Sequence, residues 1–172
     1  MKAIVITGAE CSGKTTLAEG LSKYHHTNFC KEEARSFLLQ LNRKYTNKDI
    51  EELAKKQEEI QQKFIDSQTN FAFLDTDLLT IKIWLEDKFN KCPRWINEEL
   101  QKLASNRIYF LCSPSIPYEA DPLREDKSRR AEIFEIYKTE LEKLGTKYFI
   151  VEGNKSERLK KSISFINNLK EI

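Results

Sequence analysis

Apolar and polar positions along this chain follow two different periods. Short apolar runs are separated by longer stretches in which apolar residues recur every three or four positions. Alternation of strands with helices is typical of βα units, whose strands lie parallel in one sheet. The pattern therefore predicts an α/β fold with a five-stranded parallel sheet sandwiched by helices. The expected strands are residues 2–7, 28–31, 71–74, 108–112 and 148–151.

The helical stretches carry start and stop signals. Thr46 and Asp49 have the spacing of reciprocal caps at the start of a long, charged helix over about 49–66. Gly145 is expected to end the helix over 128–144. Ligands of parallel α/β sheets bind at the carboxyl ends of the strands, so we expect functional residues in the turns that follow them. Other helices are expected at 14–23, around 37–41, after 77, and at 155–170.

Composition and charge narrow the class of protein. The chain has 172 residues, which fits one domain spanning 1–172, and it is 40% hydrophobic and 33% charged. Its net charge is only +2, and acidic and basic residues are interleaved along the chain, which argues against a dedicated nucleic-acid binder.

Neither a membrane segment nor a zinc site is expected. The apolar run at 2–6 is too short to cross a bilayer. The four cysteines form no CxxC pair, which argues against a zinc site and for reduced thiols. We expect a cytoplasmic protein with no nucleic-acid or membrane partner, and the sequence leaves a homo-oligomer open.

The turn after the first strand carries the strongest chemical signal. Residues Gly8–Thr15 match the P-loop pattern G-x-x-x-x-G-K-[ST] and stand between a predicted strand and a predicted helix, as that motif requires. Successive backbone amides there form an anion nest at a helix N-terminus. Lys14 is expected to bridge the β- and γ-phosphates of ATP, and the Thr15 hydroxyl to bind Mg²⁺. The predicted nucleotide-binding residues of this loop are Gly8, Ala9, Glu10, Cys11, Ser12, Gly13, Lys14, Thr15 and Thr16.

A P-loop also occurs in signalling GTPases, which are the first alternative class. Such proteins carry an N-K-x-D motif, whereas the run from Asn47 to Asp49 lacks the spacer residue and opens a helix. No D-x-x-G switch follows the third strand either. Both points argue against a GTPase. Within the loop, Cys11 is either a small side chain that fits the turn or a redox-sensitive thiol.

Two carboxylates follow the third strand. Asp75 ends an apolar run, as a Walker B residue does, and is expected to hold Mg²⁺ through water opposite Thr15. Asp77 is expected to contact either the metal or a hydroxyl of the substrate. For both residues the structural alternative is a cap on the following helix.

Charged residues after the other strands suggest an acceptor side and a lid. Glu32 is placed to accept the proton of an acceptor hydroxyl, and Arg35 to hold a phosphate or carboxylate group. Residues 119–131 are expected to form a lid in which Arg124 neutralises charge on the transferred group. A solvated helix start is the alternative for each cluster. The predicted catalytic residues are Lys14, Glu32, Asp77 and Arg124, and further nucleotide contacts are expected from Arg130 and from Arg158, which would stack on adenine.

These motifs, in this order, resemble the nicotinamide riboside kinase domain of the bacterial NadR-type proteins of NAD biosynthesis and the small AAA-type ATPases grouped with it. The resemblance implies transfer of a phosphoryl group from ATP to nicotinamide riboside, which gives nicotinamide mononucleotide and ADP. It also implies that Glu32 or Asp77 handles the ribose hydroxyl while the Arg124 loop closes the site. The matching segments are 8–15, 32–35, 73–77, 121–124 and 153–158.

The chain departs from that family in two respects. Lys31, Glu33 and Ala34 stand where a Trp-Glu-Tyr-Gly-Arg motif is expected to supply aromatic groups for stacking on nicotinamide. The family's fuller proteins carry DNA-binding and adenylyltransferase domains, and we expect neither in this chain.

The sequence thus predicts a P-loop NTPase fold of the nucleoside and nucleotide kinase type. The favoured function is Mg·ATP-dependent phosphorylation of a small-molecule substrate, with a nucleoside such as nicotinamide riboside as the acceptor. The alternative is a regulatory ATP-binding or ATPase module without an acceptor, for which the charged helix over 49–66 would supply the partner surface.

Overall fold

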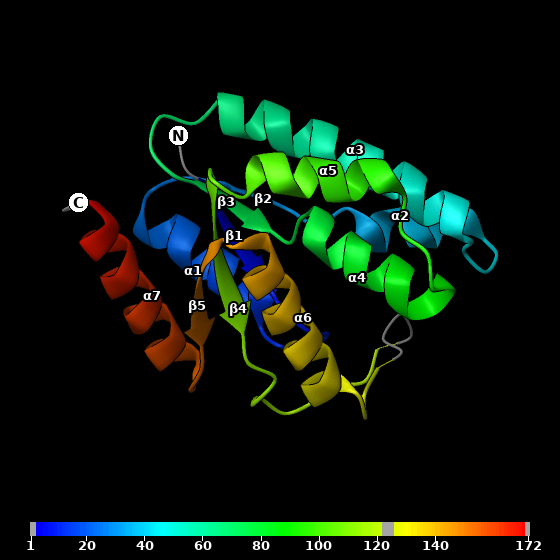
Figure 1. Cartoon of the computed structure of the whole chain (residues 1–172). Helices are drawn as coiled ribbons and strands as arrows, with labels where there is room; N and C mark the ends of the chain where they lie inside the picture. The colour runs from blue at the N-terminus through cyan, green and yellow to red at the C-terminus, as the bar shows by residue number, and fades with distance from the viewer. Residues whose placement is uncertain (1–2, 122–125, 171–172) are drawn as a thin grey trace.

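The computed structural model describes residues 3–121 and 126–170, and its strands form one sheet in the order β2-β3-β1-β4-β5. All of these pairings are parallel. The predicted α/β fold with a five-stranded parallel sheet is therefore confirmed (Figure 1). The strands are β1 (Ala3–Thr7), β2 (Phe29–Cys30), β3 (Ala72–Asp75), β4 (Arg107–Cys112) and β5 (Lys147–Val151).

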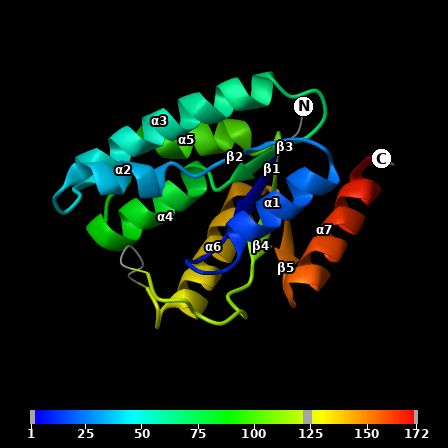
Figure 2. The same cartoon turned by 180° about the vertical axis from the view of Figure 1, so that it is seen from behind.

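Helices cover both faces of the sheet. Figures 1 and 2 show α1 and α7 together on one face and α3, α4, α5 and α6 on the other. Each face has its own apolar core. The helices are α1 (Lys14–Tyr24), α2 (Ala34–Leu41), α3 (Asn47–Asp66), α4 (Leu78–Phe89), α5 (Arg94–Leu103), α6 (Arg130–Leu144) and α7 (Lys155–Lys170).

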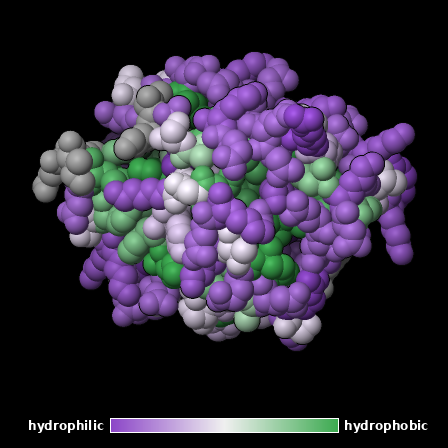
Figure 3. Space-filling model, viewed as in Figure 1, coloured by the Kyte–Doolittle hydropathy of each residue, from purple (hydrophilic) through white to green (hydrophobic). Residues whose placement is uncertain are grey.

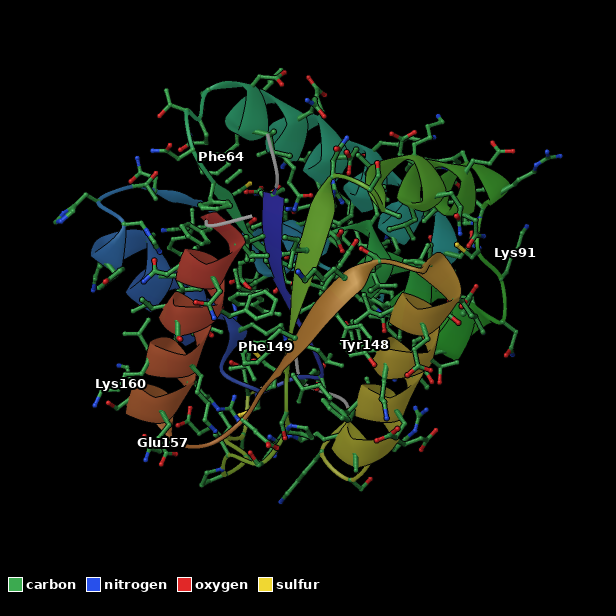
Figure 4. All side chains as sticks on the ribbon, turned by 60° about the vertical axis from the view of Figure 1, so that its left-hand side comes forward. Phe64, Lys91, Tyr148, Phe149, Glu157 and Lys160 are labelled. Carbon is green, nitrogen blue, oxygen red and sulfur yellow. The ribbon has the colours of Figure 1, made fainter. Side chains whose placement is uncertain are left out.

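The edge strand β5 shows how the two cores are separated. Successive residues of a strand point to opposite faces, and Tyr148 and Phe149 lie on opposite sides of β5 in Figure 4. Tyr148 packs against the core under α6. Phe149 stacks on Phe165 of α7, with ring centroids 4.8 Å apart. The continuous apolar character of the strands follows from this burial on two faces.

The helix caps agree with the sequence analysis, but the number of helices between β3 and β4 does not. Thr46 and Asp49 form the predicted capping box, and Gly145 ends α6 in the left-handed region at φ 63°. The sequence predicts a single helix between β3 and β4, whereas the structure has both α4 and α5. Asn90 ends α4 with φ 50°, and Pro93 precedes α5 at its N-cap. A proline is well tolerated there because it lacks an N–H that could be hydrogen-bonded inside the helix.

The register of the sheet places the ends of the central strands level with one another. Ile6 of β1 pairs with Asp75 of β3, and Thr7 pairs with Leu111 of β4. The chain leaves the central strand β1 between these two neighbours. The turn after β1 therefore begins beside the last residue of β3.

The surface agrees with the charged composition. The face in Figure 3 is mostly hydrophilic, with small and separate apolar areas. Among the described helices, none combines the length and the apolar character needed to cross a membrane.

Candidate functional site

The turns after β1, β2 and β4 surround a cleft of about 600 Å³, and α2, α4 and α6 supply its other walls. Opposite charges share this cleft, since Lys14 and Glu32 both line it. Arg124, the predicted lid arginine, lies outside the described residues. The sequence-predicted residues that do line the cleft are Gly8, Ala9, Glu10, Cys11, Gly13, Lys14, Thr15, Thr16, Glu32 and Arg35.

The turn after β1 has the backbone that a phosphate cradle needs. Gly8 has φ 139°, and a Cβ there would lie 2.7 Å from the Cys112 carbonyl oxygen, so the loop passes too close to β4 for any side chain. Gly13 takes φ 81° as the N-cap of α1. The first-turn amides of α1 have no intrahelical acceptor, and they carry the positive end of the helix dipole. The Lys14 ammonium donates to the Ala9 carbonyl at 2.9 Å across the mouth of the loop.

Thr15 and Asp75 meet beside the cradle, as predicted for a magnesium site. The Thr15 hydroxyl donates to Asp75 Oδ2 at 2.6 Å. Asp75 is only 2% exposed, and its Oδ1 has no hydrogen-bond partner among the described residues. Burial raises the pKa of this carboxyl, although the Thr15 hydrogen bond and the Lys14 charge oppose the rise. An orphaned carboxylate oxygen next to a hydroxyl fits a divalent cation.

The surroundings also indicate which cation fits. Among residues 3–121 and 126–170, no three His, Cys, Asp or Glu side chains are grouped as a self-contained metal site. Mg²⁺ is characteristically held by one or two protein oxygens, with phosphate and water completing its shell. The Thr15 and Asp75 pair therefore suits a magnesium ion that arrives with a polyphosphate.

Glu32 and Arg35, which the sequence predicts to face an acceptor, both line the cleft. The Glu32 carboxyl remains open to solvent through the cleft. The surrounding walls still displace enough water to raise its pKa, Lys14 lowers it, and Asp75 raises it again. Arg35 pairs with Asp121, which lies in the segment between β4 and α6. A carboxylate with a raised pKa beside a phosphate cradle is a stronger proton acceptor than an ordinary glutamate.

Asp77 does not reach the cleft. It is fully buried, caps α4 by accepting from the Leu79 amide at 3.0 Å, and accepts from Arg107 at 2.6 Å and from Tyr109 at 2.7 Å. These contacts occupy both carboxylate oxygens. The capping alternative describes this residue, and the predicted contact with metal or substrate has no support in the geometry.

Arg130 and Arg158 also differ from their predicted roles. Neither guanidinium lines the cleft. Arg158 is 4% exposed, and both arginines donate to backbone carbonyl groups of the loops around the cradle. The Arg158 guanidinium is therefore too buried for an adenine ring to stack on it. Ser12 is also buried, so it can contribute to the cradle only through its backbone.

The structure adds an aromatic wall that the sequence analysis missed. Tyr45 and Trp84 both line the cleft and meet edge to face, with centroids 5.1 Å apart. Trp84 Nε1 donates to the Tyr45 hydroxyl at 3.2 Å. Tyr137, whose hydroxyl lies 3.1 Å from Thr80 Oγ1, forms part of the floor. Aromatic groups are therefore present in the cleft, although they do not come from the segment around Glu32.

A family model described as an AAA domain, AAA_28, matches residues 3–158 of the chain. No curated protein sequence matches the chain significantly. The family match covers most of the fold and includes the turns after all five strands. The match confirms the part of the inferred resemblance that concerns the small AAA-type ATPases.

Solved structures share the fold at low sequence identity. A NadR protein in complex with NR is 20% identical with a TM-score of 0.76, and the match covers 99% of this chain and 52% of that one. Thymidylate kinase from Candida albicans is 16% identical with a TM-score of 0.70, covering 98% and 92%. YorR from Bacillus subtilis, in complex with phosphorylated GDP, is 18% identical with a TM-score of 0.62, covering 99% of each chain. The chain thus spans about half the length of the NadR structure, and these likenesses establish the fold alone.

Proposed function

The chain belongs to the AAA domain family, and on that premise we propose that it transfers a phosphoryl group from Mg·ATP to the hydroxyl of a small nucleoside-like molecule. One observation carries the proposal: a phosphate cradle with its lysine and a carboxylate of raised pKa share a single cleft. A module that binds nucleotide without transferring its phosphoryl group would not need the second group.

The nucleotide would lie along the turns at the carboxyl end of the sheet. The P-loop amides and Lys14 would hold its phosphates, while Thr15 and Asp75 would hold the magnesium ion that neutralises them. A second hollow adjoins the cleft at Ile116 and Pro117 and continues to the turn after β5, at 152–155. This hollow is the proposed place of the base.

Glu32 would act on the acceptor. It would take the proton of the acceptor hydroxyl as that oxygen forms its bond to the γ-phosphorus, while ADP departs with the electrons of the broken P–O bond. Lys14 would stabilise the charge that develops on the phosphoryl oxygens. Both groups line the same cleft, and the Lys14 charge already lowers the pKa of Glu32.

The aromatic wall supports a flat ring as part of the acceptor. Tyr45 and Trp84 present ring surfaces on the acceptor side of the cleft, where stacking and edge contacts stabilise an aromatic ligand. Together with the fold shared with a NadR protein in complex with NR, this wall makes nicotinamide riboside the first acceptor to test.

The test is a coupled assay of ADP release with Mg·ATP and a panel of nucleosides, nucleoside monophosphates and nicotinamide riboside. We expect one class of compound to stimulate ADP release, and the phosphorylated product to appear in equal amount by mass spectrometry. Slow ATP hydrolysis that no compound changes would contradict the kinase proposal and favour the regulatory ATPase.

Replacement of Asp75 by asparagine is expected to separate magnesium binding from stability. The substitution keeps the shape of the side chain but removes a charge that supports the cation, so the Mg²⁺ concentration for half-maximal turnover should rise about 10–100-fold. In the absence of Mg²⁺, the folded-state pKa of Asp75 is raised by burial, so its ionised form destabilises the fold above that pKa. The variant should therefore have a higher Tm than the wild type at neutral pH, with the difference shrinking as the pH falls and the wild-type carboxyl becomes protonated.

Asp66→Asn is the matched control for this substitution, because Asp66 ends α3 at the surface and, within the described part of the chain, its side chain accepts only from Gln62. It should change neither the magnesium requirement nor the Tm. An Asp75→Asn variant with a normal magnesium requirement would remove Asp75 from the proposed site.

A further inference from the structure

We propose that Arg158 and Arg130 are positioning residues that hold the phosphate cradle in its binding conformation through its outward-facing carbonyl groups, without touching the nucleotide. The inference rests on the proposed function, since it concerns how the same cradle is built. It gives both arginines a role other than the nucleotide contacts that their sequence positions suggest.

Arg158 joins three separate loops from a buried position. Its Nη1 donates to the Ser12 carbonyl of the P-loop at 2.7 Å, and its Nε donates to the Gly153 carbonyl after β5 at 2.7 Å. Its Nη2 donates to the Ser113 carbonyl at 2.8 Å and to Ser115 Oγ at 3.1 Å, in the loop after β4. The planar, always charged guanidinium is suited to such a set of fixed acceptors, which the point charge of a lysine could not serve together.

Arg130 donates hydrogen bonds to two of these three loops, the P-loop and the loop after β4. It is the first residue of α6. Its Nη2 donates to the Cys11 carbonyl at 2.8 Å and to the Ile116 carbonyl at 3.0 Å, and its Nε donates to the Glu10 carbonyl at 3.2 Å. The two arginines therefore hold three consecutive P-loop carbonyl groups, those of residues 10, 11 and 12.

The geometry of the peptide group links these hydrogen bonds to the direction of the P-loop amides. A trans peptide is planar, so its C=O and N–H bonds point in opposite directions, and the described backbone contains no cis peptide. Fixing the carbonyls of residues 10–12 on one side of the loop points the following amides, of residues 11–13, to the other side. The amides of Cys11 and Gly13 have no hydrogen-bond acceptor within 3–121 and 126–170, and both residues line the cleft. Such amides are the donors of an anion nest.

The same bonds link the cradle to the hollow proposed for the base. Gly153 and Ser115, which Arg158 holds, line that hollow. Loss of Arg158 should therefore loosen the P-loop and the base side together, whereas loss of Arg130 should loosen mainly the P-loop and the loop after β4.

The decisive experiment compares two ligands by calorimetry in the presence of Mg²⁺. Tripolyphosphate fills only the cradle, whereas ATP fills the cradle and the base hollow. We expect Arg158→Gln and Arg130→Gln each to weaken binding of both ligands, tripolyphosphate included, by about tenfold or more. The loss for ATP should exceed the loss for tripolyphosphate only in Arg158→Gln, because Arg158 also holds residues of the base hollow. Arg94→Gln should leave both affinities unchanged, because Arg94 is exposed on α5 and, among the residues that the structure describes, pairs only with Glu98.

A second measurement distinguishes a local loss of order in the P-loop from a general loss of protein stability. Amide hydrogen exchange without ligand should speed up in residues 8–15 and 113–117 of the variants while the strands of the sheet keep wild-type protection. If Arg158→Gln does not fold, Arg130→Gln carries the test, because Arg130 is only half buried.

The outcomes discriminate between the roles. Weaker ATP binding with unchanged tripolyphosphate binding would show a contact with the base and overturn the proposal, as would unchanged affinity for both. Wild-type protein that binds neither ligand would overturn the proposed function instead. In that case the hydrogen-exchange pattern would still decide whether the two arginines hold the P-loop in place.

Discussion

Replacement of Lys14 by alanine is expected to lower kcat for phosphoryl transfer by about 1000-fold, the size of effect seen when one charge-stabilising donor is removed from an enzyme site. Lys14 is the cationic side chain of the P-loop, lines the cleft and spans the loop to the Ala9 carbonyl. Its ammonium would move from that carbonyl to the phosphate oxygens when a nucleotide binds. ATP affinity should fall as well, because the charge also acts in the ground state. Steady-state kinetics and calorimetry measure the two effects.

Lys23→Ala is the matched control, because Lys23 is an exposed lysine in the last turn of the same helix. It should leave kcat and ATP affinity at wild-type values. A Lys14→Ala variant that is folded and turns over at the wild-type rate would contradict both the kinase and the ATPase proposals, since each requires a charge at the transferred phosphate.

The parts of the fold that the sequence predicts are those encoded by neighbouring residues. Strand and helix periods, the capping box at Thr46 and the glycine stop at Gly145 each depend on a few consecutive positions. The P-loop is predictable for the same reason, because its amides, lysine and hydroxyl all lie within Gly8–Thr15. The division between α4 and α5 was missed although Pro93 marks it, since the intervening segment also fits a single helix followed by a loop.

The errors at the site concern residues whose partners are distant in sequence. Arg158 and the Ser12 carbonyl that it holds are 146 residues apart, so the sequence alone could not distinguish an arginine that braces a loop from one that faces a base. Asp77 was assigned to the metal or substrate because it follows a strand. Its partners Arg107 and Tyr109 enter the same buried space only when β4 pairs beside β1.

The aromatic wall was missed for a related reason. Tyr45 and Trp84 lie 39 residues apart, in the turn before α3 and in α4, and neither belongs to a motif. The family resemblance predicts aromatic groups beside Glu32, where Lys31, Glu33 and Ala34 stand instead. The fold brings ring surfaces to the same cleft from other elements, so the absence of a local motif does not imply the absence of a stacking site.

Replacement of Glu32 by glutamine is expected to lower kcat by about 100- to 10 000-fold, the range for loss of a general base, while ATP affinity stays close to wild type. The amide has the same shape but cannot accept the proton of the acceptor hydroxyl. Glu32 belongs to the turn after β2 and contributes nothing to the cradle, so nucleotide binding should survive. Glu33→Gln is the matched control. Glu33 is the next residue, pairs with Lys56 at 3.5 Å, and does not line the cleft.

The pH dependence of kcat identifies the role of Glu32 more directly than the loss of rate does. Transfer requires the ionised carboxylate. The cleft walls displace water from around Glu32 and raise its pKa above that of an ordinary glutamate, so the wild-type rate should begin to fall at a higher pH than it would with an unperturbed carboxylate. In Glu32→Gln this fall in kcat at low pH, the acidic limb of the profile, should disappear and leave a kcat that is low and independent of pH. Glu33→Gln should keep the acidic limb. A Glu32→Gln profile that keeps the wild-type limb would assign the titration to another group. Equal losses in kcat and in ATP affinity would place Glu32 on the nucleotide side of the cleft instead of the acceptor side.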